Sequence, residues 1–340
     1  MEKKKILFRA DGNSKIGLGH LFRSFALVEM FKDKYECFFL TREESFTDVI
    51  PKEYNIDIIQ KNVLYSEEPY WISKKYSSDE FIIITDGYQF ISSYQKELKE
   101  YGFGLVYIDD LGVEKMFADI VINHSLNLNI KDFASAGYTK FALGTEYAVL
   151  RPKFIDAAKK RREIKQINEV FICFGGADFY DLTNRALEGV IDIGEINKIH
   201  IVLGGAYLHE NIFDTLKKRK EDVFIYKSIS EQEMLDLMNK CQLAIVPSST
   251  ISYEVCSVKM LILGGYYIDN QEKINRGLEF NGLIYNVGEL NKLNANDFKQ
   301  KVIEIINDSE EKYKKIINNQ SKMFDGKQKE RFNKLIESIC

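Results

Sequence analysis

The sequence has no long apolar run. Met1 to Lys5 is polar and leads directly into Ile6, Leu7 and Phe8. That apolar segment is far shorter than a signal-peptide core or a membrane span. We therefore expect a cytoplasmic protein that is neither exported nor anchored in a membrane.

Cysteine and histidine are both scarce. The five cysteines form an odd number, and no two of them have CxxC spacing. Cys37, Cys173 and Cys241 lie in or beside apolar, strand-like runs, which is typical of reduced packing thiols in the cytosol. We expect neither disulfides nor a metal site. Three of the four histidines, His124, His200 and His209, have no companions of metal-binding or catalytic type, so we interpret them as structural.

Neither sign of charge dominates. The 47 Lys and Arg residues are interleaved with 51 Asp and Glu residues, for a net charge of -4. A phosphate backbone attracts a basic surface, so nucleic acid is not an expected partner. The composition, 45% hydrophobic and 29% charged, is that of a globular protein, and 340 residues suggest about two domains.

Short apolar runs alternate with longer amphipathic stretches, which predicts strand-helix units over parallel sheets. We expect strands at 5–9, 36–41, 56–60, 81–85, 105–108, 119–123, 169–174, 198–203, 223–226, 243–246 and 261–265. A polar, basic stretch at 159–165 separates two such series. The predicted fold class is α/β, with two doubly wound Rossmann-like domains at 1–151 and 166–289. A C-terminal helical extension covers 290–340.

Ligands of open α/β sheets bind beyond the carboxyl ends of the strands. After the first strand, Gly12, Gly17 and Gly19 lead to His20 at the start of a predicted helix. A helix N-terminus disfavours positive charge, so a histidine there suits a general base. The alternative is that His20 only caps the helix or bonds the loop.

The matching loop of the second half is Gly175-Gly176-Ala177-Asp178. Successive glycine amides before a helix can bind an anion, and a diphosphate would fit. A plain tight turn capped by Asp178 is equally consistent with the pattern. No Walker A sequence or full GxGxxG motif is present.

A hydroxyl-rich loop, Ser248-Ser249-Thr250, precedes Glu254. Glu254 is four residues after Thr250, one too many for a capping box. A carboxylate one turn into a helix could accept both hydroxyls of a ribose. An ordinary charge on an exposed helix surface is the alternative.

Three further polar groups follow predicted strands: Asp86-Gly87-Tyr88, Asp109-Asp110 and Asp269-Asn270-Gln271. Paired acids can hold Mg²⁺, but no third carboxylate at ligand spacing accompanies Asp109 and Asp110. Recognition of sugar hydroxyls or amides, or loop capping, explains them more simply.

Several of these segments together resemble a known family. They are 8–11 with 16–23 (a GxGHxxR pattern), 84–88, 108–110, 119–123, 171–178 (FICFGGAD), Ser248-Ser249 with Glu254, and 267–272 (YIDNQE). In this order they are similar to the UDP-2,4-diacetamido-2,4,6-trideoxy-β-L-altropyranose hydrolases of pseudaminic acid biosynthesis. The resemblance spans residues 5 to about 285.

The resemblance implies a glycosyltransferase-B (GT-B) fold and a metal-independent, inverting hydrolysis that releases UDP, with no cofactor. It implies that His20 is the base or orients the water, and that Tyr88 and Asn270 contact the sugar. Ligand-binding roles would fall to the remaining strand-end residues: Gly17, Gly19, Arg23, Asp86, Asp110, Gly175, Gly176, Asp178, Ser248, Ser249, Glu254 and Gln271. For Arg23 a structural ion pair is an equal alternative.

The predicted function is that of a UDP-sugar hydrolase that supplies a nonulosonic acid precursor for surface glycans such as those of flagellin. One rival is an inverting glycosyltransferase, in which His20 deprotonates an acceptor hydroxyl. Another is a catalytically idle nucleotide-sugar-binding protein. The sequence does not decide the oligomeric state.

Overall fold

The computed structural model describes residues 4–13, 15–217 and 222–340. The chain divides into two compact units, each formed around its own sheet. Unit 1 comprises Met1–Pro152 and Lys327–Cys340, and unit 2 comprises Lys153–Gly326. The C-terminal helical segment is therefore shared between the two units.

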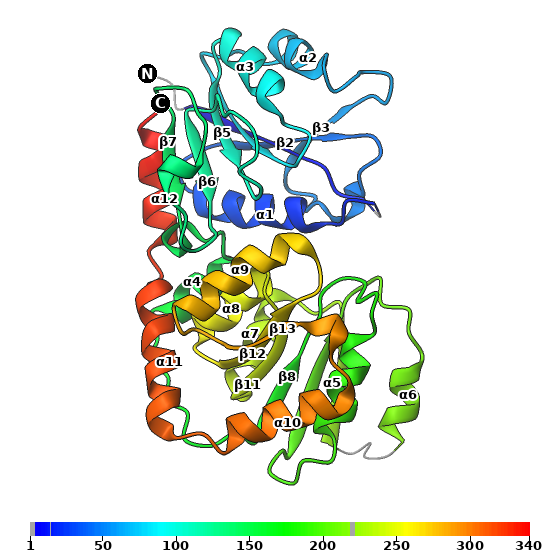
Figure 1. The fold of residues 1–340 in the computed structure, drawn as a ribbon. Helices are drawn as coiled ribbons and strands as arrows, with labels where there is room; N and C mark the ends of the chain where they lie inside the picture. Colours follow the sequence, from blue (N-terminus) through cyan, green and yellow to red (C-terminus); the bar gives the residue numbers. More distant parts are fainter. Residues whose placement is uncertain (1–3, 14, 218–221) are drawn as a thin grey trace. The chain divides into compact units, whose positions relative to one another are not determined.

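Unit 1 is built on a seven-stranded sheet in the order β3-β2-β1-β4-β5-β6-β7, in which all neighbours are parallel (Figure 1). The strands are β1 (Lys5–Ala10), β2 (Cys37–Arg42), β3 (Asn55–Ile59), β4 (Phe81–Asp86), β5 (Gly104–Ile108), β6 (Ile120–Asn123) and β7 (Lys140–Leu143). The two central strands, β1 and β4, are buried almost throughout, as expected for parallel strands covered on both faces.

The helices of unit 1 are α1 (Gly19–Phe31), α2 (Glu68–Lys75), α3 (Ser92–Glu100) and α12 (Gln328–Glu337), with short 3₁₀ turns at Thr47–Val49, Ile130–Asp132 and Thr145–Tyr147. The last helix, α12, packs on α1. The Phe31 and Phe332 rings meet edge to face at 6.4 Å, and Asn333 Nδ2 donates to the Met30 carbonyl at 3.2 Å. The end of the chain thus completes the core of the first unit.

Unit 2 repeats the arrangement with a six-stranded parallel sheet in the order β10-β9-β8-β11-β12-β13. The strands are β8 (Glu169–Ile172), β9 (Lys198–Leu203), β10 (Val223–Lys227), β11 (Leu243–Pro247), β12 (Leu261–Tyr266) and β13 (Tyr285–Glu289). The helices are α4 (Pro152–Ala158, starting at the boundary), α5 (Leu182–Val190), α6 (Asn211–Leu216), α7 (Glu231–Lys240), α8 (Thr250–Val258), α9 (Asp269–Phe280), α10 (Ala295–Ile306) and α11 (Glu310–Met323), with a 3₁₀ turn at Leu290–Lys292.

Both sheets are doubly wound with the same strand order, so the predicted fold class is confirmed. In each, the chain runs outward from the first strand in one direction and then returns to continue on its other side. The switch point lies between β1 and β4 in unit 1 and between β8 and β11 in unit 2. Ligands of such sheets bind at the carboxyl edge beside this point.

Two edge strands, β7 and β13, were not among the predicted strands, whereas α11 lies within the predicted C-terminal helical extension, 290–340. β7 has only four residues, and β13 reads Tyr-Asn-Val-Gly-Glu with no fully buried position. Neither has the apolar run that marks a central parallel strand.

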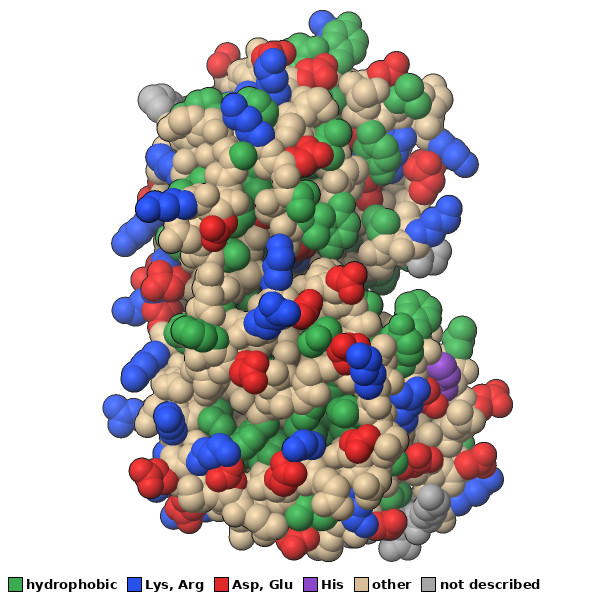
Figure 2. All heavy atoms as spheres, viewed as in Figure 1, with side chains coloured by type: hydrophobic (Ala, Val, Ile, Leu, Met, Phe, Trp, Pro, Cys, Tyr) green, Lys and Arg blue, Asp and Glu red, His purple; other side chains and the backbone are tan. Residues whose placement is uncertain are grey.

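Charged side chains of both signs are interspersed on the visible face (Figure 2). In the described part of the chain, no helix is both long and apolar enough to cross a membrane.

Candidate active site

His20 lies in the first turn of α1, directly after the loop that leaves β1. Gly17 has a φ of +79°, a left-handed conformation that only glycine adopts without strain. The loop closes on itself through backbone hydrogen bonds in both directions between Asn13 and Gly17, of 3.2 and 2.9 Å. An added Cβ at Gly17 or Gly19 would meet no atom within 4 Å, so this loop leaves open space next to its backbone.

His20 Nδ1 lies 2.7 Å from Oδ1 of Asp86, the last residue of β4. Both side chains are buried. An ionised carboxylate can only accept, so Nδ1 carries the hydrogen and Nε2 has the free lone pair. The arrangement fixes the tautomer that can take a proton at Nε2, as in a base oriented by an acid.

Arg23, one turn further along α1, binds two carboxylates. Its Nε donates to Asp86 Oδ2 at 2.7 Å, while Nη1 and Nη2 donate to the two oxygens of Asp110 at 2.7 and 2.9 Å. Asp110 follows β5, which is the neighbour of β4. The guanidinium therefore joins α1 to two adjacent strand ends, with the bidentate geometry that suits arginine.

The Arg23 charge keeps both acids ionised. Burial alone would raise the pKa of Asp86, but the Arg23 charge and its hydrogen bonds outweigh burial and lower it. For Asp110 the same balance lowers the pKa to about 2. The pKa of Arg23 is raised because these two carboxylates outweigh its own burial.

The Tyr88 ring meets the His20 ring edge to face, with centroids 5.1 Å apart. Tyr88 is 44% exposed, although the strand before it is buried. A small hollow beside it is lined by Tyr88, Tyr107, Asp109 and Glu114, among others. The Tyr88 side chain is thus partly open to solvent next to the imidazole.

Asp109, beside Asp110, has a different task. Its carboxylate accepts the backbone N–H groups of Leu111 and Gly112 at 3.1 and 3.0 Å and the Asn123 amide at 2.9 Å. Among the described residues, neither aspartate belongs to a group of three possible metal ligands. Loop capping therefore accounts for Asp109, whereas Asp110 pairs with Arg23.

His124 is buried behind the Arg23 network, and its Nδ1 accepts the Val149 N–H at 3.5 Å. Burial and the Arg23 charge lower its pKa to about 4, despite the opposing acids Asp110 and Asp86. It is a neutral structural histidine, in agreement with its interpretation from the sequence.

A second ionic cluster under the β1 loop was not predicted. Arg9, which is fully buried, donates to Glu68 at 3.0 Å from both Nε and Nη2 and to Asp11 at 2.6 Å. Arg42 also pairs with Glu68. Asp11 further accepts the Arg42 backbone N–H at 2.9 Å and Gln89 Nε2 at 3.0 Å. The cluster holds the carboxyl ends of β1 and β2 together; a charged residue inside the apolar run of β1 was its only sequence signal.

In unit 2, Gly175 and Gly176 follow β8 at the switch point. Gly175 has a φ of +84°, and a Cβ at either glycine would meet nothing within 4 Å. On its other side the loop is tightly packed, because a Cβ on Gly204 would lie 2.2 Å from the Gly176 carbonyl oxygen. The glycine pair is thus held in place from one side and leaves space on the other.

Asp178 has its carboxylate directed at the start of α5. It accepts the backbone N–H groups of Leu182 at 2.9 Å and Thr183 at 2.8 Å, and it is 3% exposed. The N-cap residue of α5 is Asp181, not Asp178 as the alternative interpretation had it. The Asp178 side chain nevertheless caps the first N–H groups of the helix, which favours capping over ligand binding.

Ser248 directly follows β11 and is fully buried, and its Oγ donates to Asn275 Oδ1 at 2.8 Å. Ser249 is half-buried and is the N-cap residue of α8. Glu254, in the second turn of α8, is only 4% exposed. The alternative of an exposed surface charge is therefore wrong for Glu254.

Asn270 and Gln271 lie in the first turn of α9, which follows β12. Asn270 is exposed, whereas Gln271 is buried and accepts the Tyr267 N–H at 3.2 Å. The Tyr267 hydroxyl in turn donates to the Phe174 carbonyl at 3.1 Å, which joins this segment to the strand before the glycine pair.

The structure thus brings the predicted residues together as two sets. His20, Arg23, Asp86, Tyr88 and Asp110 form one set at the carboxyl edge of unit 1. The second set, at the carboxyl edge of unit 2, follows β8, β11 and β12, which are adjacent strands of one sheet: Gly175, Gly176, Ser248, Ser249, Glu254, Asn270 and Gln271.

Solved structures place this fold among GT-B proteins. MurG of Acinetobacter baumannii superposes with a TM-score of 0.66 at 13% identity, covering 98% of this chain and 99% of that one. HepE of Anabaena, solved with UDP and glucose, has a TM-score of 0.62 at 10% identity, covering 98% and 100%. A UDP-N-acetylglucosamine 2-epimerase homologue from Listeria monocytogenes gives 0.64 at 12% identity, covering 99% and 96%. The chain has the GT-B type of fold.

Comparison of sequences confirms the family resemblance. The chain is 27% identical over 273 residues to the UDP-2,4-diacetamido-2,4,6-trideoxy-β-L-altropyranose hydrolase of Campylobacter jejuni, covering 79% of this chain and 93% of that protein. It is 24% identical over 255 residues to the spore coat polysaccharide biosynthesis protein SpsG of Bacillus subtilis, covering 73% of each.

An uncharacterised protein of Methanocaldococcus jannaschii is 27% identical over 271 residues, which are 74% of this chain. The matched region spans about half of that relative's length, 53%. No protein-family model matches the chain.

Proposed function

We propose that this protein hydrolyses the anomeric C–O bond of a UDP-diacetamido-trideoxy-hexose with inversion and releases UDP. The observation that carries the proposal is the His20–Asp86 pair at the switch point of unit 1, in which Nδ1 is bound to the carboxylate and Nε2 has no hydrogen bond to any described residue. The relationship to a protein named as such a hydrolase supports the substrate class.

In the proposed reaction, His20 Nε2 accepts a proton from water as the water oxygen attacks the anomeric carbon. The bond from that carbon to the β-phosphate oxygen breaks, and its electron pair leaves with UDP. Direct displacement by water on the opposite face inverts the anomeric configuration. Asp86 holds the imidazole in the required tautomer and stabilises the positive charge that forms on it.

The other predicted residues complete this division of labour. Arg23, which Asp110 holds in place, keeps Asp86 ionised, and the partly exposed Tyr88 side chain is proposed to contact the sugar next to His20. In unit 2, the Gly175–Gly176 backbone is proposed to face the diphosphate. Glu254 is proposed to accept the ribose hydroxyls, and Asn270 to contact the sugar.

We place the reaction in the cytoplasm, where it would supply a nonulosonic acid precursor of the pseudaminic acid type for surface glycans, flagellin among them. No metal ion takes part in the proposed chemistry, because His20 supplies the base. The two acids that could have held a metal are otherwise engaged: Asp110 binds Arg23, and Asp109 accepts backbone N–H groups.

An inverting glycosyltransferase is the second candidate, and the observation that favours it is the GT-B fold shared with nucleotide-sugar-binding neighbours. In that case a hydroxyl of an acceptor would replace water above His20. The two reactions differ in their need for an acceptor.

The test is to incubate the protein with a panel of UDP-deoxyaminosugars without any acceptor, after exhaustive treatment with EDTA, and to follow UDP and the free sugar. We expect stoichiometric release of UDP and of the sugar of inverted anomeric configuration. Release only with an added acceptor would indicate the transferase. Loss of activity that Mg²⁺ or Mn²⁺ restores would contradict the metal-independent mechanism.

A further inference from the structure

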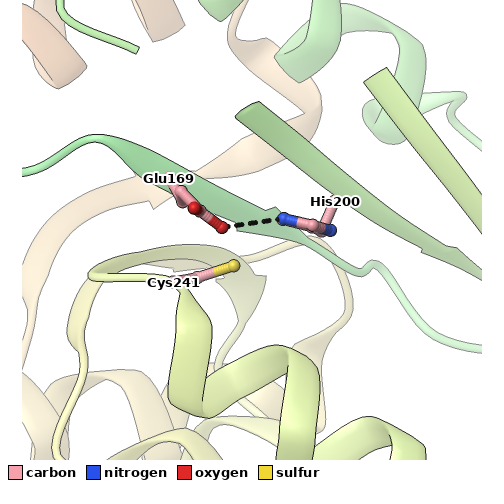
Figure 3. Close-up of side chains that lie close together, drawn as sticks. All are labelled: Glu169, His200 and Cys241. Atoms are coloured by element: carbon pink, nitrogen blue, oxygen red, sulfur yellow. Dashed lines mark hydrogen bonds and ion pairs between the residues drawn. The ribbon is translucent and has the colours of Figure 1, made fainter. Parts of the chain in front are cut away.

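Three potential metal ligands of different chemistry meet in unit 2, away from the proposed active site. Glu169 begins β8, His200 is the third residue of β9, and Cys241 lies between α7 and β11 (Figure 3). In the sequence they are 31 and 41 residues apart and show no metal-binding spacing. The parallel sheet brings them together because β8 has β9 on one side and β11 on the other.

The distances are close to those of a coordination shell. Glu169 Oε2 lies 3.0 Å from His200 Nε2, and one ligand atom from each residue, including Cys241 Sγ, lies within 4.8 Å of the others. Ligands of a tetrahedral Zn²⁺, at about 2.0 to 2.3 Å from the ion, are themselves about 3.5 Å apart. A small inward shift of the Glu169, His200 and Cys241 side chains would therefore bring their ligand atoms to the separations of a zinc shell.

The surroundings of His200 and Cys241 are those of metal ligands. The Tyr226 hydroxyl lies 3.3 Å from Nδ1 of His200, so it can accept that hydrogen and leave Nε2 for an ion. The imidazole is stacked on Phe224 and Tyr226, which fixes its plane. Cys241 is fully buried, whereas the Glu169 side chain is 23% exposed and opens the cluster to solvent.

A divalent ion would balance the charges of the cluster. Burial raises the pKa of the Cys241 thiol above its usual range, so the thiol keeps its proton until a metal displaces it. With the ion bound, the Glu169 carboxylate and the Cys241 thiolate would carry two negative charges. Lys198, whose Nζ lies 3.7 Å from Glu169 Oε1, contacts the oxygen that does not face His200. Arg162 binds the Cys241 backbone carbonyl, not its sulfur. Neither cation takes the place between the three ligand atoms.

We propose that Glu169, His200 and Cys241 form a binding site for one Zn²⁺ ion, with water as the fourth ligand. A thiolate among the donors excludes Mg²⁺ and Ca²⁺ and selects zinc or a similar soft divalent ion. This assignment replaces the sequence-based interpretation of Cys241 and His200 as purely packing and structural residues.

The site is separate from the proposed chemistry. All three ligands lie at or near the amino-terminal ends of strands, whereas Gly175, Ser248 and Glu254 follow the carboxyl ends of β8 and β11. A metal here would tie β8, β9 and the α7–β11 connection together and stabilise unit 2. It would not touch the substrate, so chelation would lower stability without abolishing turnover.

The experiment is a titration of the chelator-treated full-length protein with Zn²⁺ by calorimetry and with Co²⁺ by absorption spectroscopy. We expect one equivalent of either ion per chain, a thiolate-to-cobalt charge-transfer band, and a higher thermal midpoint with Zn²⁺ but not with Mg²⁺. Cys241→Ser should remove the band, and Glu169→Gln should weaken Zn²⁺ binding at least ~10- to 100-fold, the range known for losing even an outer partner.

Cys340→Ser is the matched control, because it removes the exposed thiol and should leave the band and the affinity unchanged. His200→Gln provides a second ligand variant if Cys241→Ser does not fold. The proposal is wrong if the wild-type protein binds no stoichiometric Zn²⁺. It is also wrong if the cobalt band persists in Cys241→Ser or disappears in Cys340→Ser.

Discussion

At the scale of single residues, the hydrogen bond from His20 Nδ1 to Asp86 is the contact on which the proposed chemistry depends. Asp86→Asn keeps the size of the side chain but removes the negative charge that fixes the tautomer. We expect kcat to fall at least ~10²-fold, in the range typical of a mispositioned general base, with the affinity for UDP nearly unchanged.

The control for this variant is Asp110→Asn, which weakens the other side of the Arg23 clamp without touching His20. Its effect on kcat should be much smaller. Equal losses in the two variants would show that Arg23, not the Asp86–His20 contact, limits turnover.

Glu254 provides the residue-scale test of nucleotide binding. It is buried in a helix next to the switch point of unit 2. If it accepts two ribose hydroxyls in both ground and transition states, Glu254→Gln should raise KM with a smaller change in kcat. The loss should be about 1.5 to 3 kcal/mol, as for hydrogen bonds to a charged group.

Calorimetry with UDP on Glu254→Gln and Tyr88→Phe checks this assignment. Tyr88→Phe should bind UDP normally and lose turnover, because its hydroxyl faces the sugar in the proposal. Unchanged UDP affinity in the Glu254 variant would remove that residue from the nucleotide site.

The position of a residue could be predicted where its sequence signal is local. That His20 lies at the start of a helix could be predicted, because a strand and a glycine-rich loop come directly before it, whereas its role as the base stays a prediction. The Arg9–Glu68 pair could not, since its members are 59 residues apart and meet only through the fold. Likewise, the pairing of Arg23 with Asp86 and Asp110 depends on β1, β4 and β5 being neighbours.

At the scale of elements, the question at the start of α5 is whether Asp178 caps the helix or binds the ligand. Asp178 accepts two backbone N–H groups of that helix. Asp178→Ala should therefore lower the free energy of unfolding by about 0.5 to 2 kcal/mol, as for loss of an N-cap. Denaturant unfolding measures the stability of Asp178→Ala and wild-type protein, and calorimetry with UDP measures the nucleotide affinity of both.

For Asp178→Ala we expect reduced stability and little change in UDP affinity. The reverse pattern, with normal stability and a large loss of UDP affinity, would make Asp178 a nucleotide ligand after all. Ser230→Ala, which removes the cap of α7 far along the chain, is the matched control for a capping loss in the same unit.

Most elements of the central sheets could be predicted, because buried parallel strands appear as continuous apolar runs. The edge strands β7 and β13 could not, since β7 has only four residues and β13 has no fully buried position, so neither forms such a run. The sharing of the C-terminal helices between two units also has no local signal: α12 carries the same helical periodicity whichever core it joins.

At the scale of the whole molecule, buried neutral His124 makes the stability of unit 1 depend on pH. Its pKa is lowered from 6.5 to about 4 in the folded protein, so below pH 6.5 the unfolded chain binds a proton that the folded chain does not. The free energy of unfolding should therefore keep its full His124 contribution above pH 6.5. It should fall by roughly 3 kcal/mol as the pH drops from 6.5 to about 4.

Chemical denaturation between pH 7 and pH 4 measures this effect. His124→Asn, which stays neutral, should flatten that part of the profile, whereas wild-type protein should show the full decline. Identical profiles for the two proteins would exclude His124 as the origin of acid sensitivity.

The central claim is that His20 is the base of a hydrolase, and His20→Ala tests it most directly. UDP release from the UDP-diacetamido-trideoxy-hexose is measured without acceptor for wild-type and variant, together with UDP affinity by calorimetry. We predict a fall in kcat of ~10²- to 10⁴-fold with UDP affinity within a few-fold of wild type. Near wild-type release of UDP by the His20→Ala protein would contradict the account.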